Sequence, residues 1–126
     1  MRLRYAIVAI VLLSGCGENP IPHSRDQEPL RLSPAQQLAT MEVDGEIPTE
    51  ALVVEAESLL RELTQGCEED AAEIVAVIGN AKSQILASGR RESAIGIGRV
   101  ILATSTSFKE RDCARVGAVL TYTMTH

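Results

Sequence analysis

Aromatic residues are almost absent from this chain of 126 residues, which has no Trp, one Phe and two Tyr. Large rings are a major source of buried apolar area in small domains, so the core must here be built from aliphatic side chains. A sugar-binding cleft is not expected either, because such clefts are usually lined by aromatic rings.

Histidine is equally scarce, with His23 in a proline-rich segment and His126 at the last position. A Ser-His-Asp arrangement needs a positioned base, and neither histidine lies where an ordered site would hold it. Gly96 and Gly98 are too few for a phosphate-binding loop, whose glycines extend further and follow a strand. We therefore expect no catalytic constellation and no cofactor, and the protein is predicted not to be an enzyme.

The charge balance is acidic, with 17 Asp and Glu against 12 Lys and Arg and a formal net charge of −5. A nucleic-acid backbone repels such a surface, so nucleic acid is not an expected partner. The acids gather in residues 42–73 and the bases in residues 82–115. Either these segments pack with complementary surfaces, or a basic face with Arg90, Arg91 and Arg99 docks an acidic partner.

Four acids lie close together in the chain at Glu68, Glu69, Asp70 and Glu73. Calcium prefers several oxygen ligands, but this spacing is not that of an EF-hand loop. A local reason for these acids is already available, because carboxylates in the first turn of a helix interact favourably with the helix dipole. We therefore predict no metal site here.

The chain begins with a positive segment followed by a short apolar one. Arg2 and Arg4 precede residues 5–13, which carry no charge and are almost all apolar. A helix that crosses a bilayer needs about 20 apolar residues, whereas about nine are typical of the hydrophobic region of a secretion signal.

Residues 13–16 read Leu-Ser-Gly-Cys. This quartet resembles the lipobox of bacterial lipoproteins. The resemblance implies a signal peptide at residues 1–15, cleavage before Cys16, and lipid on the thiol and the new amino group of Cys16. Gly17 stands where Asp would retain a lipoprotein in the inner membrane, which implies an outer-membrane anchor that faces the periplasm.

Removal of the signal peptide would leave 111 of the 126 residues, and the loss of two arginines would take the net charge from −5 to −7. This acidity does not favour a further electrostatic attachment to anionic lipid, so the lipidated cysteine must provide the anchor. Residues 16–32 contain three prolines and few apolar residues. They are predicted to form the lipidated N-terminus and a flexible tether that spans about 20–25 Å.

Residues 33–126 are predicted to form one small helical domain. Ser33 and Gln36 have the spacing of a capping box at the start of a short helix. Two longer segments, 48–65 and 69–88, repeat apolar residues with helical spacing.

The last third of the chain is ambiguous between helix and strand. Apolar residues in 93–108 and 113–126 fit a helical face, but interspersed glycines and alternating threonines also fit strands. We favour helices, because two clear helices come before and a lone hairpin would need a sheet to join. The predicted fold class is all-α, a small bundle of about four helices, with strands left open in this third.

Cys67 and Cys113 are the two cysteines besides Cys16. The predicted extracytoplasmic location is oxidising, and a bridge would close a loop of about 47 residues, worth on the order of 4 kcal/mol in the chain-entropy model. A redox pair is less favoured, because the chain has no C-x-x-C spacing. We predict a Cys67–Cys113 disulfide over two buried free thiols.

This combination of lipid anchor, tether and small disulfide-linked helical domain is similar in layout to helical pilotins, lipoproteins that escort secretin subunits to the outer membrane. The likeness covers architecture and compartment only. It implies a non-catalytic binding or assembly factor for an envelope complex, with a groove between helices that takes an amphipathic helix of another envelope protein. The predicted partner-binding residues are Ile95, Ile97 and Arg99.

An alternative with the same layout is a protective lipoprotein, which acts in entry exclusion of a mobile element or in immunity to a toxin. Such a protein also needs a stable, anchored, non-catalytic domain. Neighbouring genes would distinguish the two hypotheses.

Overall fold

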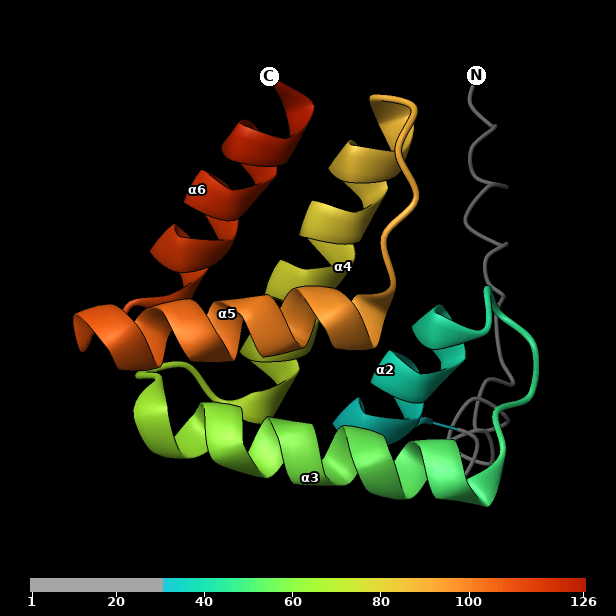
Figure 1. Ribbon diagram of the computed structural model, residues 1–126. Coiled ribbons are helices and arrows are strands. Elements are labelled where there is room, and N and C mark those ends of the chain that lie inside the picture. Colours follow the sequence, from blue (N-terminus) through green and yellow to red (C-terminus); the bar gives the residue numbers. More distant parts are fainter. Residues whose placement is uncertain (1–30) are drawn as a thin grey trace, which may run out of the picture. The chain divides into compact units, whose positions relative to one another are not determined.

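The computed structural model describes residues 31–126, of which Leu32–His126 form one compact unit. Five helices make up this part of the chain (Figure 1): α2 (Pro34–Glu42), α3 (Glu50–Gly66), α4 (Ala71–Ala87), α5 (Ala94–Phe108) and α6 (Cys113–Thr125). The predicted signal peptide, Cys16 and nearly all of the predicted tether lie outside the described residues. The all-α prediction is confirmed, with one helix more than the four or so expected.

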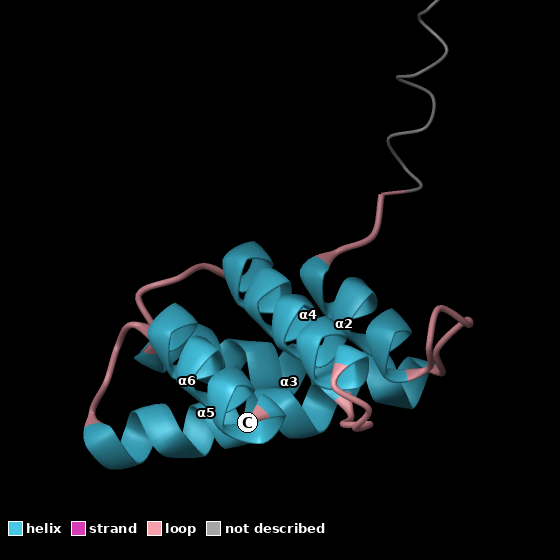
Figure 2. Cartoon of the chain, turned by 90° about the horizontal axis from the view of Figure 1, so that it is seen from above, coloured by secondary structure: helices cyan, strands magenta, loops and turns pink. Residues whose placement is uncertain are grey.

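The two ambiguous segments are both helices, α5 and α6, and Figure 2 shows no strand between residues 31 and 126. Ser93 and Asp112 explain where these two helices begin, since each side chain accepts a hydrogen bond from a backbone N–H of the first turn. Such N-caps contribute about 1 kcal/mol each. The strand alternative for the last third of the chain is therefore wrong.

The predicted capping box at the start of α2 is present. The Ser33 hydroxyl accepts from the Gln36 N–H at 3.2 Å, and the Gln36 side chain accepts from the Ser33 N–H at 2.8 Å. The two central helices follow the predicted segments 48–65 and 69–88 to within about two residues at each end.

The helices form two crossed pairs, with α2 beside them. Figure 1 shows α5 lying along α3, while α4 and α6 stand side by side across that pair. The short α2 packs against α3 and also contacts α4 and α5. Every described helix therefore contributes one face to a single core.

That core is aliphatic, as the scarcity of aromatic residues requires. Leu38, Leu63, Ile78 and Ile101 are almost completely buried and come from four different helices. Phe108, in contrast, is 78% exposed. Full burial of each aliphatic side chain contributes about 1.5–3 kcal/mol, so stability rests on many medium-sized side chains rather than on a few rings.

Two glycines let the helices approach closely. A Cβ atom added to Gly98 in α5 would lie 2.8 Å from the Leu59 side chain, and one added to Gly117 in α6 would lie 2.5 Å from Cγ1 of Val77. Val77 is β-branched and cannot swing away as a long side chain can. The α4–α6 contact therefore depends on a missing side chain at position 117.

We expect Gly117→Ala to lower the free energy of unfolding by about 1–3 kcal/mol, because the added methyl overpacks the α4–α6 contact. Urea unfolding of the variant and the parent protein measures the difference. Adding Val77→Ala should recover part of the loss, giving a coupling energy of at least about 0.5 kcal/mol.

Gly66→Ala is the matched control, since the added Cβ would meet no atom within 4 Å other than those of its chain neighbours and of the backbone of its own helix. In that open position alanine should be neutral or stabilising by a few tenths of a kcal/mol, through its higher helix propensity. Equal losses at positions 66 and 117 would contradict the packing explanation.

Candidate functional site

The predicted partner-binding residues of α5 do not share an exposed surface. Ile95 and Ile97 are only 5% and 3% exposed and belong to the hydrophobic core, whereas Arg99 is exposed. The two isoleucines therefore lack the exposed side-chain surface that a contact with a partner requires. Their side chains provide the face that packs α5 onto its neighbours, and the backbone N–H of Ile95 donates to the Glu42 carboxylate at 2.8 Å.

The arginines proposed for an acidic partner are mostly engaged within the domain. Arg99 forms an ion pair with Glu55 of α3, and Arg90 donates to the backbone oxygen of Met124 at 3.2 Å. Arg91 alone of the three has no ion pair or hydrogen bond among residues 31–126. The Arg99 pair joins the acidic and basic segments of the chain, as the first of the two charge interpretations expected, although exposed pairs add only about 0–1 kcal/mol.

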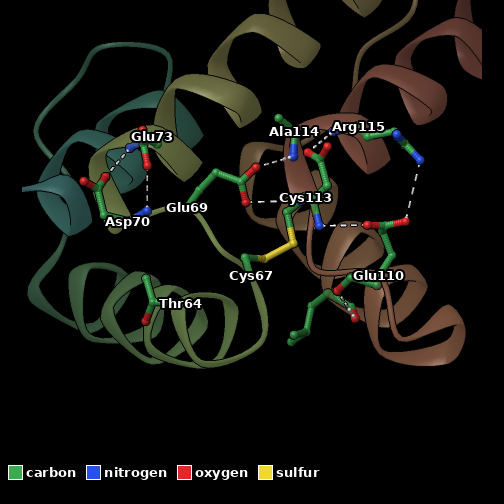
Figure 3. The surroundings of a disulfide bond; sticks show 12 residues. Thr64, Cys67, Glu69, Asp70, Glu73, Glu110, Cys113, Ala114 and Arg115 are labelled. Atoms are coloured by element: carbon green, nitrogen blue, oxygen red, sulfur yellow. Dashed lines mark hydrogen bonds and ion pairs between the residues drawn. A yellow bond between two sulfur atoms is a disulfide. The ribbon is translucent and has the colours of Figure 1, made fainter.

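The predicted disulfide between Cys67 and Cys113 is present. Their Cα atoms lie 5.6 Å apart, and both side chains are buried. Figure 3 shows that the bond joins the end of α3 to the first residue of α6. Beside it the backbone N–H of Glu68 donates to the Arg111 oxygen at 2.8 Å.

The acidic residues next to this disulfide serve as helix caps. The two Glu69 carboxylate oxygens accept from the N–H groups of Cys113, at 3.2 Å, and Ala114, at 3.0 Å, at the start of α6 (Figure 3). Asp70 and Glu73 form a capping box at the start of α4. Charge-assisted bonds of this kind are stronger than neutral ones.

Glu68, Glu69 and Asp112 place one carboxylate oxygen each within 4.8 Å of one another. Since Glu69 and Asp112 each accept from backbone N–H groups of α6, their position follows from the start of that helix. The start of α6 thus accounts for the positions of two of the three carboxylates.

Replacing Cys67 and Cys113 together with Ala should lower the free energy of unfolding by about 4 kcal/mol, because the unfolded chain regains the entropy of a loop of roughly 47 residues. The double variant and the protein with the disulfide intact are compared by urea and thermal unfolding. Both carry Cys16→Ser, so that no other thiol is present. Equal midpoints would show that the bond does not stabilise the domain.

An apolar hollow lies between the C-terminal end of α5 and α6. This α5–α6 groove has a volume of about 450 Å³, and its apolar lining is Phe108, Val116, Val119 and Leu120. Phe108 and Val119 are 78% and 59% exposed. Glu110 and Arg115 are the charged residues of its lining, and Oε1 of Glu110 lies 4.0 Å from Nη1 of Arg115.

Sequence reasoning placed the partner-binding residues on α5 but missed this groove. Val116, Val119, Leu120 and Thr123 recur at i, i+3, i+4 and i+7, which is the spacing of one helical face. The same pattern predicts a core face equally well. The one available signal was Phe108, the single Phe of the chain at the end of a predicted helix.

A more polar cleft of about 410 Å³ lies between α4 and α6, with Asn80, Gln84, Tyr122 and His126 in its lining. The Tyr122 and His126 rings stack with their centroids 4.2 Å apart. His126 accepts or donates at Thr125 and Tyr122 only. The Thr125 hydroxyl oxygen lies 3.0 Å from Nδ1 of His126, and both residues line the cleft. No Asp, Glu or Cys side chain belongs to this lining.

Comparison with models of protein families, with curated proteins and with solved structures finds no match. Within residues 31–126, no helix combines the length and apolar character that crossing a bilayer requires. Function is therefore inferred from the chain's own residues, and the α5–α6 groove is the strongest candidate site.

Proposed function

We propose that this protein is an outer-membrane lipoprotein that faces the periplasm and acts, like a pilotin, as a non-catalytic binding or assembly factor for an envelope complex. The α5–α6 groove is the observation that carries the proposal. It combines exposed large apolar side chains with a rigid, disulfide-linked frame, which is what a site for another protein needs.

The chemistry of the groove suits an amphipathic helix. Phe108 and Val119 expose apolar surface to water. Burying such side chains contributes about 1.5–3 kcal/mol each. A helix from another envelope protein would set its apolar face on these residues, in the helix-in-groove mode of recognition. Glu110 and Arg115 at the rim would orient it more than they strengthen it.

The lipid anchor is supported by the order of features in the first 16 residues: two arginines, a short apolar segment and Leu-Ser-Gly-Cys. Several acyl chains on Cys16 hold a protein at a bilayer far longer than one does. The 15 residues between Cys16 and Leu32 would let the domain reach a partner beside the membrane.

Cys16→Ser should prevent lipidation and processing, because the serine hydroxyl does not replace the thiol that accepts the diacylglycerol. We expect the wild type to incorporate labelled palmitate and to fractionate with membranes, and the variant to do neither and to keep its signal peptide. Palmitate incorporation into the Cys16→Ser variant would refute the lipobox.

The partner can be captured with a photoreactive phenylalanine analogue at Val119, in the α5–α6 groove, of the lipidated protein in intact envelopes. We expect one dominant adduct, and peptide mapping should place the crosslink on an amphipathic helix of the captured protein. Phe108→Asp should reduce the adduct at least tenfold, since a charge in the groove opposes apolar docking.

The same analogue at Leu86, which is 49% exposed on α4 outside the groove, is the matched control. Equal adducts from both positions, or none from Val119, would contradict groove binding. A component of a conjugation apparatus or a toxin as the captured protein would instead identify the entry-exclusion or immunity function.

A further inference from the structure

A second apolar surface lies where the described chain enters the fold. This α2–α3 edge is a cleft of about 380 Å³, and Leu32, Ile47, Pro48 and Val53 form the apolar part of its lining. Ile47 is 95% exposed, more than any other large apolar residue between 31 and 126, and Leu32 is 44% exposed. The edge therefore presents a projecting isoleucine above an apolar floor.

Ile47 lies between a turn that ends α2 and the residue that caps α3. Asp44 and Gly45, with φ of 56° and 89°, turn the chain sharply after α2, and Asp44 lies 3.7 Å from the Lys82 ammonium of α4. On the other side Thr49 caps α3 through the Leu52 N–H. Because both flanks are fixed, the exposure of Ile47 is a feature of the fold.

The chain connection indicates what lies against this edge. Leu32 lines the cleft and is also the residue at which the segment from Cys16 reaches the domain, after 15 intervening residues. Even fully extended, that segment spans at most about 55 Å. A lipid on Cys16 would thus tether the domain to a bilayer through the α2–α3 edge, whereas Figure 1 shows the α5–α6 junction at the opposite side of the domain.

We propose that the α2–α3 edge docks on the lipid surface that carries the Cys16 anchor, with the Ile47 side chain inserted at the headgroup–acyl boundary. The inference rests on the lipid anchor of the proposed function and adds an orientation to it. Docking of this edge directs the α5–α6 groove away from the membrane, toward a partner in the periplasm.

One isoleucine cannot hold a free protein on a membrane. The lipid anchor lowers the affinity that docking of this edge requires. A tether of this length supplies an effective concentration in the millimolar range, so that a weak contact is occupied for much of the time. Glu46 also lines the cleft, and its negative charge disfavours anionic headgroups. The preferred surface is therefore zwitterionic.

The test uses the full lipidated protein in phosphatidylcholine–phosphatidylethanolamine vesicles, with an environment-sensitive fluorophore on Glu46→Cys. We expect quenching by lipids that carry a spin label near the headgroup. Ile47→Ser should reduce the ratio of docked to undocked protein about tenfold, because its apolar side chain is lost.

The same fluorophore on Val119→Cys, at the α5–α6 groove, is the matched control and should remain unquenched. Equal and low quenching at both positions in membrane-bound protein would overturn the docking inference and leave the anchor intact. A Cys16→Ser protein is expected not to bind vesicles under both proposals. Equal membrane binding by that variant would refute the lipid anchor and, with it, the docking inference that rests on the anchor. A crosslink from position 47 to a protein in intact envelopes, without lipid quenching, would show a protein-binding edge instead and would also overturn the inference.

Discussion

The position of α6 depends on the connection between the end of α3 and the start of α6. Three interactions coincide there: the Cys67–Cys113 disulfide, the backbone hydrogen bond from Glu68 to Arg111, and the Glu69 carboxylate on the first N–H groups of α6. A small domain without large buried rings has little apolar area with which to hold a terminal helix. Because α6 forms one wall of the α5–α6 groove, the proposed binding surface depends on this connection as well.

Much of the fold could be predicted from local signals. The capping box at Ser33 and the repeated aliphatic residues of α3 and α4 are local patterns, and the structure confirms them. The helix–strand ambiguity of the last third arose because the glycines of α5 lower its helix propensity. Gly98 is accommodated by close packing against Leu59, a tertiary contact that no local pattern contains.

The candidate site was less accessible to sequence reasoning. Ile95 and Ile97 are predicted from the sequence as partner-binding residues. Which residues of α5 are buried depends on the rotation of the helix about its axis, and that rotation is set by its contacts with α3 and α4. The disulfide could be predicted because the lipobox interpretation assigns Cys16 to lipid and leaves two cysteines to pair. The use of Glu69 as a cap on α6 could not, since the two positions are 44 residues apart in the chain.

The disulfide also makes residues 67–113 a covalent ring, since the bond closes a segment with a sequence separation of 46. The exposed connection between α4 and α5, which includes Ser88, Gly89 and Arg91, lies inside that ring. A protease that cuts there would open the ring without dividing the molecule, and α6 would remain linked to α3 through sulfur. Exposed loops are the preferred sites of proteolytic nicking, and in this one a single cut separates nothing.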